Sequence, residues 1–364
     1  MLVTAVITRL PPAIDGVGDY ALHLAIQLRN DLGIETHFVV GDPTWKGATQ
    51  IQGFNITQVS DCSADSLLSV LPSDRSSPNT LLLHYVNYGY AKRGCPVWLV
   101  DGLQRWRTLS VNRLMVTMFH ETYVSGRPPW TSSFWLSPLQ KNLATRLARL
   151  SDRCLTSRQD YAKLLYKLSR GKHPQIPTLP VFSNIGEPKQ VPPLSERKRG
   201  LVVFGSPSHR LKAYRESLAQ LELTCELLGI EEISDIGQST NIPLSSVNGV
   251  PVVELGHLCA DKISDLMLNS LAGFFDYNPD FLAKSGIFAA YCAHGLLPVS
   301  AGASALSVDD IEAQNHYWVP DRQTINGNVL VQLQAIADNA HRWYQTHNLP
   351  VHAKTFAALL GNKK

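Results

Sequence analysis

The clearest chemical potential lies in the glycines of Ile14–Ala21, which reads Ile-Asp-Gly-Val-Gly-Asp-Tyr-Ala. The apolar run Leu2–Thr8 before them predicts a buried parallel strand, and Val17–Asn30 has its apolar residues at helical spacing. A glycine-rich turn between strand and helix lets backbone N–H groups approach a ligand, and the helix dipole favours an anion there. Gly16 and Gly18 are therefore candidates for binding a diphosphate. The alternative is a tight turn that needs glycine only for its backbone angles.

A second candidate follows Leu201–Gly205, an apolar stretch that predicts a strand opening into a loop. Arg210 and Lys212 come next, ahead of a predicted helix. Two cations at such a place can neutralise the charge that develops on a leaving diphosphate. The alternative is that both are solvated residues of the first helical turn.

His120 stands at the end of the predicted strand 114–120. An imidazole there can hydrogen-bond a sugar hydroxyl or a phosphate, or polarise a reacting group. The alternative is a structural histidine bonded to backbone. Glu121, the next residue, is a possible partner for it.

Length and composition limit the class of protein. A chain of 364 residues is too long for one ordinary core, and 44% hydrophobic with 17% charged residues is typical of globular domains. A formal charge of +3 gives no reason to expect nucleic-acid binding. The six cysteines contain no CxxC pair, which favours reduced thiols in a cytosol. Without a signal-peptide pattern or an apolar run of roughly 20 residues, we expect a cytoplasmic protein, or at most one attached to a membrane surface.

Strand-like runs alternate with helical patterns through most of the chain, which is the rhythm of doubly wound parallel sheets. Six prolines between 171 and 200 interrupt this rhythm, and it restarts at 201. Strands are predicted at 2–8, 36–41, 80–85, 114–120, 153–157, 201–205, 232–236, 251–255, 272–276 and 296–300. Helices are predicted at 17–30, 65–71, 97–109, 138–150, 212–228, 281–294 and, with a break at Pro350, 327–360.

These patterns predict an α/β protein with two doubly wound, Rossmann-like domains that face a cleft. The first domain is expected at 1–185, a linker at 186–200 and the second domain at 201–335. A helical tail follows at 336–364, and whether it packs back on the first domain stays open. Ligands of such folds bind at the carboxyl ends of the strands, where the candidate residues lie.

The chain resembles glycosyltransferases of the GT-B fold, in particular the large retaining group that uses nucleotide-sugar donors (family 4-like, group 1). The likeness is carried by five segments: Gly-Val-Gly-Asp-Tyr at 16–20, Met-Phe-His-Glu at 118–121, Leu-Thr-Ser at 155–157, Phe-Gly at 204–205 leading to Arg210 and Lys212, and the stretch 288–299. The resemblance implies a donor nucleotide in the second domain and a sugar or lipid-linked acceptor at the first. It also implies a role in polysaccharide or glycan assembly.

For individual residues, the resemblance implies that Arg210 and Lys212 occupy the place of the family's cationic diphosphate pair. His120 then matches the histidine near the transferred sugar, and Gly16 and Gly18 approach the donor or the acceptor. No cofactor and no bound metal are implied, and the chain has no Asp-x-Asp triplet.

The sequence departs from the family in one helix. Two glutamates eight positions apart are usual there, whereas 281–294 contains none and Ala290 falls near the place of the second. Asp276, Lys284 and Ser285 are the polar candidates nearby for donor binding.

Three other interpretations stay open. The missing glutamates fit a non-catalytic GT-B-like protein that binds a sugar or a partner. The run 16–21 also fits GxGxx[GA], with Asp42 where a ribose-binding acid stands, but seven residues separate it from the strand, which disfavours an NAD-dependent oxidoreductase. Finally, the basic amphipathic stretch 138–150, preceded by aromatic residues, is compatible with contact to an anionic membrane. Packing of its leucine stripe on the first domain's sheet is the favoured alternative.

Overall fold

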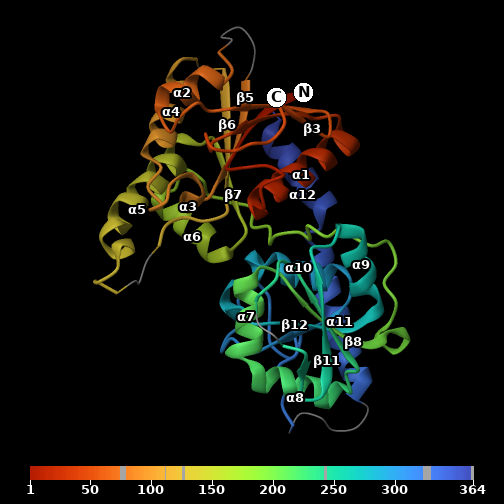
Figure 1. The fold of residues 1–364 in the computed structure, drawn as a ribbon. Helices are drawn as coiled ribbons and strands as arrows, with labels where there is room; N and C mark the ends of the chain where they lie inside the picture. The colour runs from red at the N-terminus through yellow and green to blue at the C-terminus, as the bar shows by residue number, and fades with distance from the viewer. Residues whose placement is uncertain (74–78, 111, 125–127, 242–243, 323–328, 362–364) are drawn as a thin grey trace. The chain divides into compact units, whose positions relative to one another are not determined.

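The computed structural model describes residues 1–73, 79–110, 112–124, 128–241, 244–322 and 329–361 (Figure 1). The chain divides into two compact units. Unit 1 comprises Met1–Pro180 and Leu349–Lys364, and unit 2 comprises Val181–Asn348. Each unit is an α/β domain built on one mostly parallel sheet, which confirms the fold class predicted from the sequence. The unit boundary falls a few residues before the predicted linker.

The sheet of unit 1 has the strand order β3-β4-β2-β1-β5-β6-β7, and all its neighbours are parallel except β3 and β4. Because β1 lies between β2 and β5, the connections after β1 and β5 leave in opposite directions. This is the switch point at which doubly wound domains bind ligands. The strands are β1 (Leu2–Ile7), β2 (Glu35–Val40), β3 (Gln50–Ile51), β4 (Phe54–Gln58), β5 (Asn79–Tyr85), β6 (Arg113–Phe119) and β7 (Arg153–Thr156).

Helices cover both faces of this sheet. On one face Ala21 and Ala25 of α1 pack with Phe38 of β2, and on the other Leu143 and Leu147 of α5 pack with strands β5 and β6. Both leucines are 0% exposed and Leu150 packs partly buried against the same cluster, so this part of the leucine stripe belongs to the core, as the favoured interpretation held. Leu139, at the start of the stripe, is 40% exposed. The helices are α1 (Gly16–Leu32), α2 (Ala64–Val70), α3 (Asn87–Tyr90), α4 (Val97–Thr108), α5 (Ser132–Leu150), α6 (Gln159–Leu168) and α12 (Leu349–Leu360).

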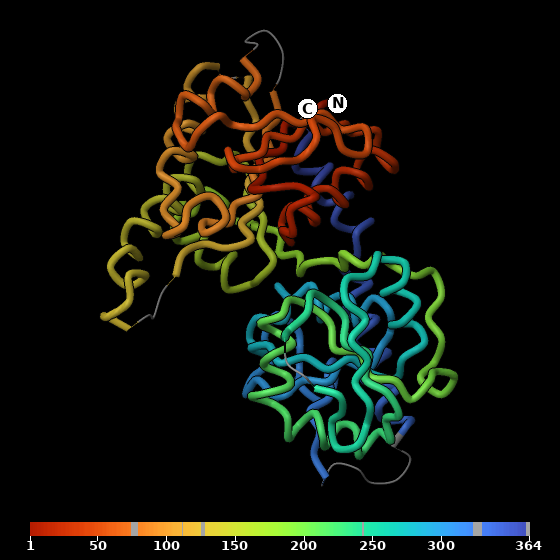
Figure 2. The backbone as a smooth tube through the Cα atoms, in the orientation of Figure 1, coloured from red at the N-terminus to blue at the C-terminus, as the bar shows by residue number. Residues whose placement is uncertain are grey.

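The C-terminal helix α12 belongs to unit 1, and it lies beside α1 (Figure 1). Figure 2 shows the blue end of the chain entering the unit that holds the red N-terminal strands. The imidazole of His352 lies 2.9 Å from the carbonyl of Pro180 through Nε2 and 2.8 Å from the hydroxyl of Tyr20 through Nδ1. Since a carbonyl only accepts, Nε2 carries the proton and Nδ1 accepts from Tyr20. Arg153 of β7 donates to the carbonyls of Ala358 and Gly361 at the other end of α12.

The sheet of unit 2 has the order β10-β11-β9-β8-β12-β13, with only the β10–β11 pair antiparallel. Its switch point lies between β8 and β12. The strands are β8 (Lys198–Phe204), β9 (Glu232–Ile236), β10 (Ser246–Val247), β11 (Val250–Gly256), β12 (Ser270–Phe275) and β13 (Leu297–Ser300). The helices are η1 (Leu194–Glu196), α7 (Pro207–Arg215), α8 (Leu218–Leu228), α9 (Ala260–Asn269), η2 (Pro279–Lys284), α10 (Gly286–Ala293) and α11 (Val329–Gln345).

Two helices predicted as continuous are broken. The predicted helix 212–228 is α7 followed by α8, because Ser217 leaves helical geometry and its hydroxyl donates to Asp276 (2.8 Å). The predicted helix 281–294 is η2 followed by α10, because Ser285 is extended and caps α10. Conversely, α5 starts at Ser132, six residues before its predicted start, with Thr131 as its N-cap.

Buried histidines should make unit 1 sensitive to mild acid. Burial lowers the pKa of His352 to about 4, whereas an unfolded histidine titrates near 6.5. Between these values the unfolded chain binds more protons, so the folded state loses stability as the pH falls. We expect the urea midpoint to fall between about pH 6.5 and about pH 4, and the fall to be less steep, by up to one proton, in His352→Gln. Equal slopes in the two proteins would show that His352 does not contribute.

Candidate functional site

In unit 1 the glycine loop connects β1 to α1 at the switch point. Asp15 is the N-cap of α1, and its Oδ1 accepts from the amides of Val17 (2.9 Å) and Gly18 (3.2 Å). Its Oδ2 accepts from the hydroxyl of Thr8 (2.7 Å). Two of the amides that the sequence offered to an external anion are therefore satisfied by the chain's own carboxylate. The predicted diphosphate cradle is wrong for Gly18, because an anion there would compete with Asp15.

The two glycines of this loop have different surroundings. A Cβ on Gly18 would overlap the carbonyl oxygen of Arg9, so glycine is required there for α1 to pack against the loop after β1. A Cβ on Gly16 would meet nothing within 4 Å, and Gly16 is exposed. Close packing therefore explains Gly18, and Gly16 is the position at which a ligand can approach the backbone.

Asp15 and Asp19 make the glycine loop acidic. Burial, and then the charge of Asp15, raise the pKa of Asp19 to about 6. Asp42, the acid that a dinucleotide ribose would need, is bound to Arg9 (2.6 Å) and to the hydroxyl of Thr44 (2.7 Å). A loop with carboxylates at Asp15 and Asp19 repels a diphosphate and favours a ligand with hydroxyl groups.

His120 follows β6 and is 7% exposed. Its Nε2 shares a hydrogen bond with Nδ1 of His84 (3.1 Å), and its ring meets that of Tyr20 edge-on at 5.0 Å. Tyr20 has similar ring contacts with His84 and His352. One nitrogen of His120 is thus fixed by a buried imidazole, rather than by backbone as the structural alternative assumed.

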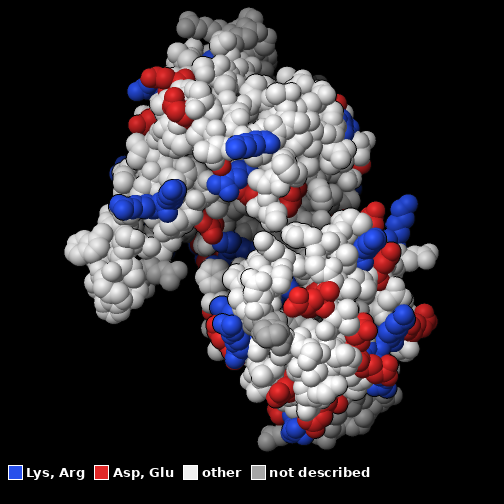
Figure 3. Space-filling view, viewed as in Figure 1, with Lys and Arg blue, Asp and Glu red and all other residues white. Residues whose placement is uncertain are grey.

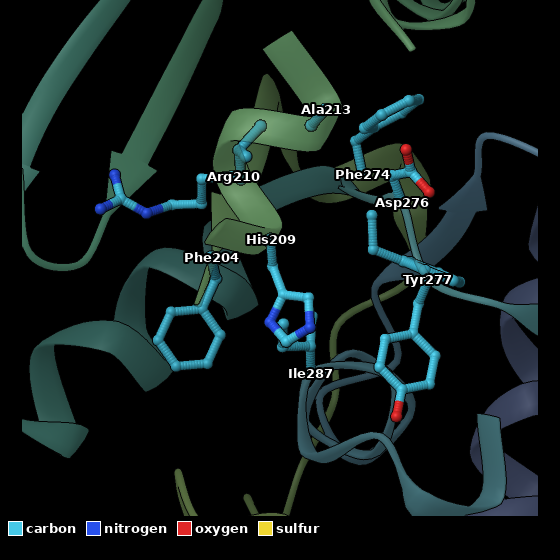
Figure 4. A pocket seen from close by; sticks show the side chains of 10 residues that line it. Phe204, His209, Arg210, Ala213, Phe274, Asp276, Tyr277 and Ile287 are labelled. Atoms are coloured by element: carbon cyan, nitrogen blue, oxygen red, sulfur yellow. The ribbon is translucent and has the colours of Figure 1, made fainter. Parts of the chain in front are cut away.

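In unit 2 the corresponding switch point holds a shallow recess between the loops after β8 and β12 (Figure 4). His209 and Tyr277 face each other across it, with ring centroids 5.6 Å apart. Phe204, Arg210, Asp276 and Ile287 are among the other residues that line it. The recess measures about 10 Å³, room for about one water molecule. Sequence reasoning did not single out His209 or Tyr277, although both lie at strand exits.

Arg210 is placed differently from its prediction. It is 1% exposed, forms an ion pair with Asp235 of β9, and donates to the carbonyls of Gly205 (3.1 Å) and Gln238. In Figure 4 its side chain extends away from His209 and Tyr277. A guanidinium with these partners is not free for a diphosphate, so the predicted direct contact is wrong and Arg210 supports the loops after β8 and β9 instead.

Lys212 and Asp276 each influence His209 electrostatically. Burial and then Lys212 lower the pKa of His209, and Asp276 opposes the effect, so both charges are close to its ring. Lys212 is exposed on α7, and Asp276 follows β12 with Oδ2 accepting from Ser217 (2.8 Å). The unit 2 switch point thus has an exposed lysine (Lys212), a carboxylate (Asp276) and two rings, those of His209 and Tyr277.

Ser285 and Lys284 precede α10. The hydroxyl oxygen of Ser285 accepts from the amide of Phe288 (3.2 Å), and Ser285 is buried, so its role is that of a helix cap. Lys284 is half-buried at the end of η2. Ala290 is 0% exposed inside α10, a helix without a single carboxylate.

Within the described ranges the chain contains neither a metal-binding cluster nor a helix able to span a membrane. No group of three or more His, Cys, Asp or Glu side chains there is arranged to hold a metal ion. No helix in the same ranges combines the length and hydropathy needed to cross a bilayer.

The sequence matches no family model and no curated protein. Solved structures match it over its whole length. It is similar to WaaG, a glycosyltransferase involved in lipopolysaccharide biosynthesis, at 12% identity and a TM-score of 0.57, with 100% of each chain covered. It is also similar to the pneumococcal O-GlcNAc transferase GtfA, solved with UDP and GlcNAc, at 8% identity and a TM-score of 0.61, covering 99% of this chain and 98% of that one.

A third similar structure is apo OtsA, at 13% identity and a TM-score of 0.59, covering 100% of this chain and 99% of that one. At these identities the similarity establishes the fold. The chain has the GT-B fold of glycosyltransferases, with two Rossmann-like domains, as the sequence resemblance implied.

Alanine substitutions of Gly16 and Gly18 should show which of the two glycines is required for packing. Gly18→Ala should lower the free energy of unfolding by roughly 1–3 kcal/mol, because its Cβ forces α1 away from the carbonyl of Arg9. Gly16→Ala is the matched control and should leave stability nearly unchanged. Urea unfolding measures both, and a Gly18→Ala protein as stable as the parent would contradict the close packing.

Proposed function

We propose that the chain is a cytoplasmic glycosyltransferase. It transfers a sugar from a nucleotide-diphosphate donor to a hydroxyl acceptor, with retention of configuration, in polysaccharide or glycan assembly. The observation that carries this proposal is the match of both units, over the whole chain, to structures of glycosyltransferases. The UDP and GlcNAc held by GtfA support a nucleotide-sugar donor. No metal or cofactor is part of the proposal.

The donor binds at the switch point of unit 2 in this proposal. The diphosphate leaves with the electron pair of the bond between its oxygen and the sugar's anomeric carbon. The acceptor hydroxyl oxygen forms the new bond to that carbon and gives up its proton to the departing diphosphate oxygen. Lys212, in the last turn of α7, stabilises the charge of the leaving group. His209 and Tyr277 supply ring surface and hydrogen-bonding groups beside Lys212. Asp276 and Lys284 line the approach, whereas Arg210 and Ser285 act by holding the loops and the helix.

The acceptor binds at the switch point of unit 1. Gly16 leaves the backbone open, and Asp19 offers a carboxylate to a hydroxyl group. His120 stands at the adjacent strand exit, oriented by His84. A site of this composition suits a neutral, hydroxyl-rich sugar better than a diphosphate.

Variants of the two cations test the donor site. Lys212→Ala should weaken UDP binding roughly tenfold or more, because a charge-assisted contact is lost, and should leave stability unchanged because Lys212 is exposed. Arg210→Met should instead lower the free energy of unfolding by roughly 3–5 kcal/mol, because Asp235 is left buried and unpaired. Calorimetric titration with UDP and GDP, urea unfolding and a turnover assay over nucleotide sugars measure these effects. Parent-like UDP affinity in Lys212→Ala would refute the donor site.

A second candidate is a non-catalytic sugar- or partner-binding protein. It is favoured by the absence of any carboxylate in α10 and by the burial of Arg210. The turnover assay separates the two: nucleotide binding without transfer or hydrolysis for any nucleotide sugar supports the second candidate.

The start of α5 fits the membrane contact left open by the sequence. Trp130 is 85% and Trp135 73% exposed, and Phe134 and Leu139 are each 40% exposed. No acidic residue occurs between Glu121 and Asp152. In Figure 3 basic side chains lie above the white surface of this tip. Exposed tryptophans beside cations favour an anionic lipid surface, so we propose that the aromatic tip, rather than the leucine stripe, contacts the membrane.

Vesicle sedimentation tests the aromatic tip. The double variant Trp130→Ala, Trp135→Ala should bind vesicles containing phosphatidylglycerol several-fold less than the parent, with an unchanged Tm because both rings are exposed. Leu306→Ser, which changes an exposed residue of unit 2, is the matched control and should bind as the parent does. Equal sedimentation of the double variant and the parent would exclude the tip as a lipid contact.

A further inference from the structure

Two buried polar atoms at the carboxyl end of β5 have no hydrogen-bond partner within the described residues. They are the hydroxyl oxygen of Tyr85 and Nδ2 of Asn87. Tyr85 is 0% and Asn87 1% exposed. Buried polar groups are nearly always hydrogen-bonded, since an unpartnered one forfeits its interaction with water. Two such atoms within three residues, at the ligand-binding edge of a doubly wound sheet, point to a partner that binds there.

Both atoms border the turn of Gly94 and Cys95. A Cβ on Gly94 would lie 2.9 Å from Nδ2 of Asn87, so the amide faces this turn directly. Burial, and then Cys95 and Glu121, raise the pKa of Tyr85, and Cys95 packs against the core cluster that contains Tyr85. The amide of Glu121 also donates to the carbonyl of Tyr85 (3.4 Å).

The neighbouring polar groups already have partners. Gln140 is 0% exposed, its Oε1 accepts from the amide of Val124 (3.1 Å), and its Nε2 donates to the carbonyl of Arg93 (2.9 Å). The hydroxyl of Tyr90 donates to backbone carbonyls. Gln140 and Tyr90 are therefore satisfied, whereas the Tyr85 hydroxyl and the Asn87 amide nitrogen beside them have no hydrogen-bond partner among the described residues.

The chemistry of the gathered groups defines the ligand. Asn87 contributes N–H donors, the Tyr85 hydroxyl donates or accepts, and the half-exposed carboxylate of Glu121 accepts. Adjacent hydroxyls of a sugar ring both donate and accept, and so match this set. Tyr88, 37% exposed and next to Asn87, adds an aromatic ring at the surface.

We propose that Tyr85, Asn87 and Glu121 form a subsite for the hydroxyl groups of a carbohydrate acceptor. Glu121 stands at the surface, and Tyr85 and Asn87 form the floor beneath it. The identification of the ligand as an acceptor rests on the proposed function and deepens it. The hydroxyl-binding chemistry itself stands on the two unpartnered atoms.

Tyr85→Phe gives the sharpest test, because it removes only the hydroxyl. An unpartnered hydroxyl adds no stability, so the Tm should stay unchanged or rise, while binding of the methyl glycosides of glucose, galactose and mannose should weaken about tenfold for whichever of them the parent binds. Asn87→Leu, similar in volume, should behave in the same way. Tyr90→Phe is the matched control: its hydroxyl donates to the carbonyls of Val6 (3.1 Å) and His84 (3.0 Å), so its loss should lower the Tm and leave glycoside binding unchanged.

Saturation-transfer NMR on the full chain, without nucleotide, measures glycoside binding separately from UDP binding. Glycoside binding that Tyr85→Phe weakens supports the subsite even if UDP fails to bind, in which case only the transferase proposal falls. The subsite is overturned if the parent binds none of the three glycosides, or if Tyr85→Phe and Asn87→Leu bind them as the parent does. It is also overturned if Tyr85→Phe lowers the Tm as much as Tyr90→Phe, since the hydroxyl then has a structural partner.

Discussion

The buried ion pair between Arg210 and Asp235 fixes the geometry on which the unit 2 site depends. Arg210 comes from α7 and Asp235 from β9, and the same guanidinium donates to the carbonyls of Gly205 and Gln238. One side chain therefore joins the loops after two neighbouring strands. Gly237 completes the junction, since a Cβ there would overlap the carbonyl of Gly205. Because the carboxyl end of β8 is held in this way, α7 can present His209 and Lys212 toward the loop after β12.

In unit 1, too, a charged side chain holds the loop at the switch point, but there it is a carboxylate. Asp15 binds Thr8 and the first amides of α1, so a carboxylate of the chain occupies the place where an external anion would bind. In each unit the charged residue that most resembles a ligand-binding group is committed to the fold. The groups that remain available to a ligand therefore differ between the two switch points. Unit 2 offers an exposed lysine with two rings, and unit 1 offers groups that can hydrogen-bond hydroxyls. This division agrees with a charged donor at one unit and a neutral acceptor at the other.

The alternation of apolar strands and amphipathic helices predicted the central strands of both sheets, because parallel strands buried on both faces leave a strong pattern. The edge strands β3 and β10 and the partly exposed β4 escaped prediction. Helix interruptions escaped prediction where a side chain rather than glycine or proline ended the helix: Ser217 bonds to Asp276, 59 residues away, and no local pattern records that contact. The same limit applies to the site. Arg210 and Gly18 carry the residue types that bind diphosphates, but their partners, Asp235 and the carbonyl of Arg9, come from other segments. The spacing of residues identified the strand exits correctly. Only the three-dimensional contacts distinguish the residues there that hold the fold from those that a ligand can reach.

The absence of a carboxylate from α10 also follows from the contacts that this helix makes within the fold. Phe288–Ala293 is buried throughout, and Tyr291 donates to backbone carbonyls of β8 and β12 (3.2 and 3.3 Å), so this helix is fully used in joining the strands of unit 2. A glutamate in place of Ala290 would be buried beside those strands and would need a partner of its own. Because α10 is used for packing, the proposed function assigns donor recognition to the loops after β8 and β12 and to α7. Asp276 follows β12 and Lys212 lies on α7, and the charges of both act on the pKa of His209.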